Sequence, residues 1–160
     1  MASFIPAAGR YGIYVTANLQ DTPVYLMLVC NTDLTISRSR DVIDANSKCG
    51  PNQIPAKTVT VEITGTVQVK FSSDGNETFD GQASEMLLDK LWKQGISFNW
   101  KIAPIPDENN PNPLPGELIY EGEGFFSSLD TNYPTDDVPT SDFTLSVQGD
   151  YTTTATPATT

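Results

Sequence analysis

Glu121 and Glu123 are the residues of this chain most suited to chemistry by their type and spacing. They stand two positions apart in a strand-like run, so their side chains share one face of that strand. A glycosidase needs two acids placed about 5–10 Å apart. The surrounding sequence supplies neither an apolar pocket nor an aromatic platform for a sugar, so we interpret the two residues as exposed acids.

Other common chemistries are excluded by what the sequence lacks. The chain has no histidine, which removes the commonest general base, the commonest zinc ligand and every nucleophile that a histidine activates. The glycines at residues 122–124 lie among carboxylates, which would repel a phosphate. Acidic pairs at residues 107–108 and 136–137 do not follow the alternating pattern of a calcium loop. We therefore expect no enzymatic activity, no cofactor and no metal required for folding.

A segment of mixed charge follows a strand-like stretch in the first third of the chain. Residues 34–37 alternate apolar and polar side chains, as in a strand with one buried face. Charged residues of both signs come next: Arg38, Arg40, Asp41, Asp44 and Lys48. Mixed charges past the end of a strand can pair across an interface and set its register. We predict that these residues contact another subunit; the alternative is a solvated strand end and loop.

The elements that must position these residues are predicted to be strands, with one helix. Strands are expected at residues 11–17, 24–29, 57–71, 96–103, 117–129 and 141–149, with a short edge strand at 78–81. The strand at 57–71 far exceeds the usual length of about 5–6 residues. It must therefore either bend at Gly65 or project beyond the core. Prolines and asparagines at residues 104–116 predict a long exposed loop.

The helix is expected at residues 84–95. Ser84 can cap its start, Glu85 lies favourably in its first turn, and Gly95 ends it. One apolar stripe is expected to pack on the sheet as core, and it consists of Leu87, Leu88, Leu91 and Trp92.

Length and charge set the limits of the architecture. The 160 residues suffice for one domain, expected at 1–149, with a flexible Thr/Ala/Pro-rich tail at 150–160. The net charge of -11 argues against specific nucleic-acid binding. The sequence shows neither a signal peptide nor the apolar run of about 20 residues that crosses a bilayer, so we expect cytoplasmic synthesis and no membrane insertion. In a reducing compartment Cys30 and Cys49 are expected to be free thiols, a disulfide being the alternative.

In their order, these segments resemble the phage major tail protein family, the tail tube proteins, over roughly residues 10–150. The matching residues are Ser37, Arg38, Ile43, Asp44, Lys48 and Gly50 around the charged segment, Tyr120, Glu121 and Gly122 in a later strand, and the closing strand FTLSVQG at 143–149. The chain departs from the family where PNQI at 51–54 replaces a segment that often carries tryptophan. It also has a long Pro-rich insertion and no added immunoglobulin-like module.

The resemblance implies both a fold and a function. The fold would be mainly β with one α-helix: a β-sandwich or barrel of tail-tube type, with a long projecting strand or hairpin and one flanking helix. The protein would be a structural part of the virion, made in the host cytoplasm and assembled as hexameric rings stacked into a tail tube. Its partners would be copies of itself, the tape-measure protein and other tail proteins. DNA would pass through the lumen without specific binding. An acidic or neutral wall suits this role, because lysines and arginines on the wall would bind the phosphates of DNA.

Two alternatives share the strand pattern. One is a carbohydrate-binding or adhesive β-sandwich, which would need exposed aromatic side chains on one face, and the only tryptophans are Trp92 and Trp100. The other is a tail-completion or baseplate ring protein, which would have the same fold without polymerising.

Overall fold

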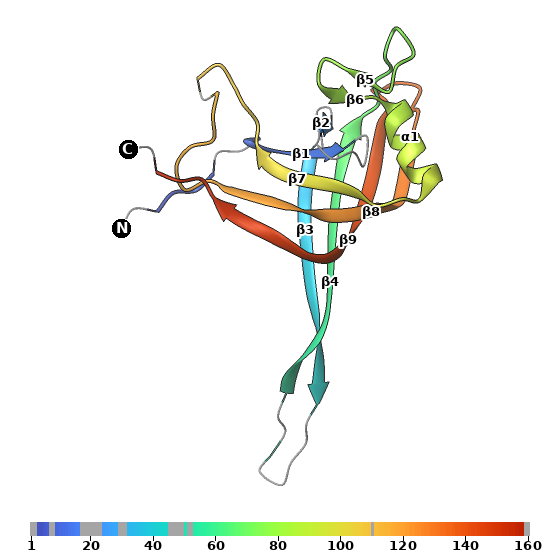
Figure 1. Ribbon diagram of the computed structural model, residues 1–160. Helices are drawn as coiled ribbons and strands as arrows, with labels where there is room; N and C mark the ends of the chain where they lie inside the picture. The colour runs from blue at the N-terminus through green and yellow to red at the C-terminus, as the bar shows by residue number, and fades with distance from the viewer. Residues whose placement is uncertain are drawn as a thin grey trace.

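The computed structural model describes residues 3–6, 9–16, 24–28, 32–44, 50, 53–109 and 111–158. Within them a single nine-stranded sheet has the order β3-β4-β9-β8-β7-β1-β2-β6-β5 (Figure 1). The elements in chain order are β1 (Tyr11–Thr16), β2 (Tyr25–Leu28), β3 (Thr32–Asp44), β4 (Gln53–Gln68), β5 (Thr78–Phe79), β6 (Gln82–Ala83), α1 (Glu85–Gln94), β7 (Phe98–Pro104), β8 (Leu118–Asn132) and β9 (Thr140–Ala155). Neighbouring strands are antiparallel except for β2 and β6, which are parallel. The mainly β fold with one helix was predicted from the sequence.

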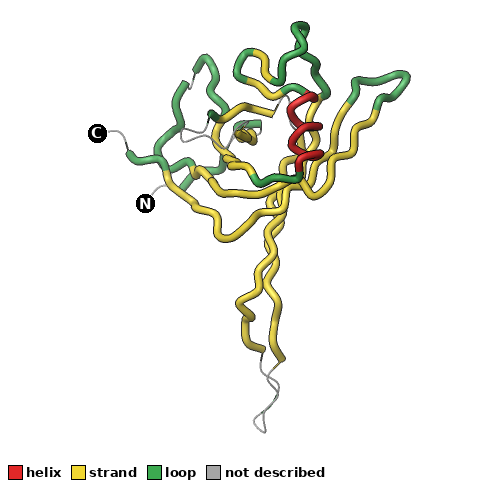
Figure 2. The backbone as a smooth tube through the Cα atoms, turned by 45° about the vertical axis from the view of Figure 1, so that its right-hand side comes forward, coloured by secondary structure: helices red, strands yellow, loops and turns green. Residues whose placement is uncertain are grey.

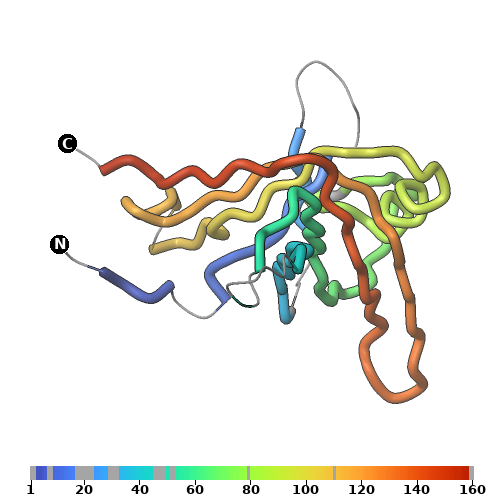
Figure 3. The backbone as a smooth tube through the Cα atoms, turned by 90° about the horizontal axis from the view of Figure 1, so that it is seen from below, coloured from blue at the N-terminus to red at the C-terminus, as the bar shows by residue number. Residues whose placement is uncertain are grey.

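The sheet folds over itself because β8 and β9 change direction together. Seen from below, the two strands run side by side through the same bend (Figure 3). The register between them shifts twice, between Glu121 and Glu123 and again between Phe126 and Ser128. Such irregularities bend a strand and increase its twist. Gly124 lies between the two register shifts. A Cβ on Gly124 would lie 2.5 Å from the Ser146 carbonyl oxygen on β9, so a side chain cannot fit at residue 124 without a shift of the backbone.

The hydrophobic core lies inside the folded sheet and is closed at one end by α1. Phe98, Trp100 and Leu145 are fully buried on the sheet, and Leu87 and Leu91 are buried on the helix. Burying a side chain of this size contributes about 1.5–3 kcal/mol relative to exposure. The core therefore gives the sheet and the helix a common interior.

The helix begins and ends where the sequence predicts, with two corrections. Gly95 is left-handed at φ 60°, and its N–H donates to the carbonyls of Leu91 and Trp92. Ser84 is at the N-cap, but its hydroxyl donates to the carbonyl oxygens of Asn76 and Glu77 instead of capping the helix. Trp92 is 44% exposed and is not core, because it lies at the edge of the stripe formed by the buried leucines.

Strands β3 and β9 extend well beyond their predicted ends. Strand β3 continues through the charged segment to Asp44, because pairing with β4 supplies its backbone hydrogen bonds without a core. Strand β9 continues to Ala155, so the predicted flexible tail begins as paired strand. The pairing of Thr152 with Glu121 and of Thr154 with Ile119 holds it to β8. Both segments were predicted not to be strands because their side chains are polar. Pairing of backbone groups requires no apolar side chain, so the predictions were wrong.

Candidate assembly surfaces

A two-stranded hairpin formed by β3 and β4 projects from the body of the molecule (Figure 2). Strand β4 pairs with β9 only from Glu62 to Gln68, and β3 is the outermost strand of the sheet. Among the described residues, 53–61 of β4 are therefore paired with β3 alone. Of the two possibilities for the long strand, bending at Gly65 or projecting beyond the core, the structure shows projection. We call residues 38–44 and 53–61 the arm.

The structure separates the charged residues that the sequence grouped together. Arg40 lies on the arm, where its Nη1 donates to the Ala56 carbonyl oxygen at 2.9 Å. Asp44 lies further out and accepts a bond of 3.4 Å from the Gln53 amide. Asp41 is exposed at the register shift between Arg40 and Val42.

Arg38 differs from these residues because it turns back to the body. Its Nε donates to the Tyr151 hydroxyl at 2.6 Å, and this bond raises the pKa of Arg38 above its usual value. Lys48, Cys30 and Cys49 lie outside the described residues, so the interface role of Lys48 and the state of the two cysteines stay predictions.

The outer part of the arm also carries exposed apolar side chains, and the sequence did not predict their exposure. Val42 and Ile43 are 56% and 55% exposed, and Ile54 is 45% exposed. Ile43 lies opposite Ile54, whereas Val42 lies opposite Pro55, so adjacent cross-strand pairs place apolar groups on both faces of the hairpin. The signal was the Val42-Ile43 pair, which interrupts an otherwise charged segment.

A second surface is the outward face of the sheet formed by β3, β4, β9 and β8. The cross-strand register places hydroxyl, amide and carboxylate side chains on it, opposite the core face with Ile63, Val67 and Leu145. We call these residues the polar face: Thr35, Ser37, Ser39, Thr60, Glu62, Thr64, Thr66, Gln68, Ser128, Asp130, Asn132, Thr140, Asp142, Thr144 and Ser146. Phe125, opposite Ser146, borders the polar face where the strands bend. None of the polar-face residues is basic.

Two carboxylates of the polar face are direct neighbours. Asp130 on β8 lies opposite Asp142 on β9, and Thr66 on β4 lies on the other side of Asp142. The Thr66 hydroxyl donates to Asp142 Oδ1 at 2.6 Å. Like charges directly opposite each other destabilise a sheet. The fold thus carries a local electrostatic cost on this face.

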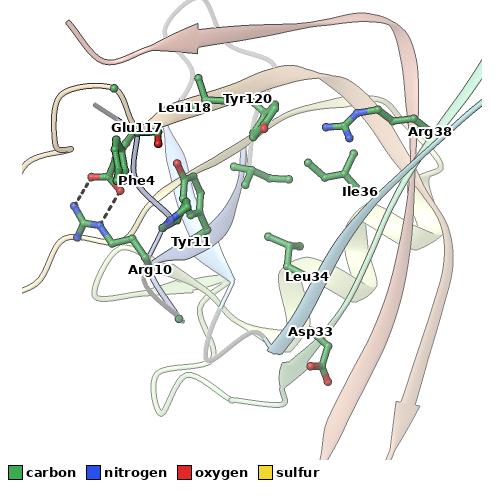
Figure 4. A pocket seen from close by; sticks show the side chains of 15 residues that line it. Phe4, Arg10, Tyr11, Asp33, Leu34, Ile36, Arg38, Glu117, Leu118 and Tyr120 are labelled. Carbon is green, nitrogen blue, oxygen red and sulfur yellow. Dashed lines mark hydrogen bonds and ion pairs between the residues drawn. The ribbon is translucent and has the colours of Figure 1, made fainter. Parts of the chain in front are cut away.

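A cavity of about 1030 Å³ opens on the other side of β3, between this strand and the start of β8 (Figure 4). Leu34, Ile36 and Tyr120 form apolar walls. At its far side Arg10 holds the buried Glu117, with Nε and Nη2 donating to the two carboxylate oxygens at 3.1 and 3.0 Å. These bonds hold the pKa of Glu117 below its usual range.

The Arg10 side chain also ties down the Pro-rich loop. It donates to the carbonyl oxygens of Ile105 at 2.7 Å and Asn112 at 3.4 Å. The Leu114 N–H donates to Glu117 Oε1 at 2.6 Å. The segment 104–116 was predicted to be a loop, and the structure shows that both of its ends contact the ion pair of Arg10 and Glu117.

The acids first considered for catalysis lie on an exposed part of the sheet. Glu121 is opposite Lys101 and Glu123 is opposite Asn99, and both glutamates are exposed. Among the described residues, no group of three or more Asp, Glu or Cys side chains is placed to hold a metal ion. In the same part of the chain, no helix is long and apolar enough to span a membrane.

The arm exposes apolar side chains beyond the core, and the polar face extends over four strands. Comparison with known families identifies the class: a model of the phage tail tube protein matches residues 6–153. The chain belongs to the phage tail tube protein family. This family is structural and not enzymatic, so the predicted resemblance and the absence of an enzymatic role are confirmed. The sequence matches no curated protein.

Solved structures share the fold at low sequence identity. A chain of the SPP1 tail tube gives a TM-score of 0.69 and 13% identity, over 95% of this chain and 81% of that one. A chain of the tail of the empty gene transfer agent particle, refined with C6 symmetry, gives 0.67 and 14%, over 94% and 100%. The tube-terminating cap of the anti-feeding prophage gives 0.59 and 15%, over 98% and 95%. These likenesses confirm a fold of tail-tube type.

Proposed function

We propose that the chain assembles as hexameric rings stacked into a phage tail tube, which forms the channel for genome delivery. The arm is the observation that carries this proposal. It extends away from the molecule's own core, and within the part of the chain that the structure describes its two strands pair only with each other beyond Glu62. A two-stranded hairpin without further packing is only marginally stable in water. An arm of this kind gains stability by lying against another copy.

The backbone of the arm supports pairing between subunits. Over residues 53–61, the edge of β4 that faces away from β3 presents N–H and C=O groups that no other described strand pairs. Unpaired edges of this length template the addition of another chain. In a ring or a stack, the neighbouring subunit supplies that partner in a controlled geometry.

The side chains of the arm supply the remaining contact. Burial of Val42, Ile43 and Ile54 against a neighbour would remove exposed apolar area from water. Arg40 and Asp41, with Asp44 and Lys48 further along, would pair across the contact and fix its register. The arm thus combines an apolar contact with a charge pattern that selects one alignment.

The polar face suits the wall of the channel. DNA binding depends on lysine and arginine side chains that neutralise phosphates. The polar face offers hydroxyls, amides and the carboxylates of Glu62, Asp130 and Asp142 instead. The adjacent pair Asp130 and Asp142 costs stability in the monomer, and that cost is explained if this face must let a polyanion pass without holding it.

The same function implies partners and a location. The tube would contact the tape-measure protein and other tail proteins, and DNA would pass through it without specific binding. Synthesis in the host cytoplasm would precede incorporation into the tail of the virion. The chain's net charge of -11 supports a lumen that does not retain DNA.

A ring protein at the end of the tube is the second candidate function. The similarity to a tube-terminating cap supports it, because that protein has the same fold. Electron microscopy of the purified protein separates the two candidates. Long tubes are expected for a tail tube protein, and single rings for a terminating protein.

Charge reversal on the arm tests the proposal. Arg40→Glu should leave the monomer folded by circular dichroism and block tube formation, because one unfavourable pair is repeated at every interface of a closed ring. An exposed ion pair contributes only about 0–1 kcal/mol, so the fold itself should survive. Arg40→Lys is the matched control and should assemble, since it keeps the charge and can still donate to Ala56. If Arg40→Glu forms tubes of normal length at physiological salt, the charged residues of the arm are exposed to solvent and do not contribute to the contact between subunits.

A further inference from the structure

Arg38 occupies the point where the arm leaves the body. It lies opposite Val61 on β4. The next residue, Glu62, is the first residue of β4 that pairs with β9. At this point β3 and β4 continue outward, while β8 and β9 turn away toward the termini (Figure 1). We call the place where the two strand pairs separate the fork. The arm continues from the sheet here as two strands, so the direction of the arm depends on contacts across the fork.

The Arg38 side chain spans the fork. Its guanidinium points from β3 toward Tyr120 on β8 (Figure 4). The carbon Cζ lies 5.9 Å from the Tyr120 ring centroid and 5.8 Å from that of Tyr151 on β9. The Nε donates to the Tyr151 hydroxyl at 2.6 Å. A planar guanidinium can stack on aromatic rings and donate in its plane at once, which a lysine ammonium cannot.

Tyr120 and Tyr151 are partly buried and pack against the core of the body. The Tyr151 ring lies 6.1 Å from Trp100, which is fully buried, and 6.3 Å from Tyr120. Gly122 makes room for this packing, because a Cβ there would lie 3.0 Å from Trp100 Cζ2 and 3.1 Å from Tyr151 Cβ. The contacts therefore form a continuous path from the core, through Tyr151, to the arm.

We propose that Arg38, Tyr120 and Tyr151 form a brace that fixes the angle between the arm and the body. They are positioning residues for assembly: Arg38 acts within its own subunit, in place of the contact between subunits expected from the sequence. A stack of rings repeats one arm direction in every subunit, so an arm that swings would reach its neighbour in few of its orientations. The assembly part of this proposal rests on the proposed tube function, whereas the geometric part does not.

Pulsed electron resonance on the monomer tests the brace directly. Spin labels at Thr58→Cys on the arm and Gln94→Cys on α1, in a chain with Cys30→Ser and Cys49→Ser, report the distribution of distances between arm and body. A narrow distribution is expected for this labelled parent. Tyr151→Phe, which removes one hydroxyl, and Arg38→Met, which removes the guanidinium, should broaden it. Tyr133→Phe changes an exposed tyrosine away from the fork and should leave it unchanged.

The same variants, without labels, are then compared in tube assembly. Tyr151→Phe and Arg38→Met should remain folded by circular dichroism and form several-fold fewer tubes than Tyr133→Phe. A broad distribution in the labelled parent, or an unchanged width in both variants, would overturn the brace. Broadening with normal tubes would overturn its role in assembly. If the unsubstituted protein forms no tubes, the tube function fails, and the distance measurement still decides the brace.

Discussion

Glu117 lies beneath the Pro-rich loop, with Arg10 as its buried partner. The carboxylate is 3% exposed and accepts two hydrogen bonds from the guanidinium and one from the Leu114 N–H. Hydrogen bonds from Arg10 are the main reason that its pKa is lowered. This one residue thus joins the start of β1, the loop and the start of β8.

The lowered pKa of Glu117 predicts a loss of stability in acid. The unfolded chain binds this proton more tightly than the folded one, so the contribution is fully present above the ordinary glutamate pKa of about 4.3. It is lost as the pH falls through the lower folded value. Glu117→Gln should be less stable than the parent near neutral pH, because Arg10 loses its charged partner. The gap between their urea midpoints should narrow as the pH falls from about 6 to about 3.

Glu121→Gln is the control for this measurement, since Glu121 is exposed. Its urea midpoint should follow that of the parent at each pH. A gap between Glu117→Gln and the parent that stays constant across the whole pH range would show that the ion pair does not contribute to acid sensitivity.

Helix α1 closes one end of the core through a row of leucines. Leu91→Ala should lower the free energy of unfolding by about 2–5 kcal/mol, the usual cost of truncating a buried leucine. Trp92→Ala on the next residue should cost much less, because its side chain is 44% exposed. Denaturant unfolding of the monomer measures both. Equal losses for the two variants would contradict the observed orientation of the helix.

At the scale of elements, the sequence predicted those whose side chains show a period. The alternation around Ile63 and Val67 identified β4, and the spacing of Leu87, Leu88 and Leu91 identified α1. The outer part of β3 and the end of β9 were missed because pairing with a neighbouring strand holds them without an apolar face. Periodicity reports burial, and these segments are strands that are not buried.

The candidate sites were predictable to a smaller extent. The charged segment was predicted to follow the end of a strand, whereas residues 38–44 are part of β3. Arg38 and Arg40 have different environments although they are two residues apart. The partner of Arg38 is Tyr151, which the sequence assigned to a flexible tail. The polar face also went unpredicted as a surface, because it combines four strands whose register only the structure gives.

At the scale of the whole molecule, the polar face would determine whether the proposed channel retains DNA. Tubes of the Asp142→Lys variant should retain short duplex DNA in a salt-dependent manner, because a lysine repeated around and along the wall binds phosphates. Asp142→Asn removes the charge without adding a cation, and its tubes should not retain DNA. Co-sedimentation of DNA with tubes at rising salt measures this. Equal retention by both variants would place Asp142 away from the lumen.

The assembled tube provides the most direct test of the central claim, that this chain builds a tube through its arm around its polar face. The measurement is a helical reconstruction by cryo-electron microscopy of tubes formed by the purified protein. We predict stacked six-fold rings, each β3–β4 arm lying against another subunit, and the face with Glu62, Asp130 and Asp142 turned to the channel. Tubes in which the arms extend freely into solvent, or in which this face lies on the outside, would contradict the account.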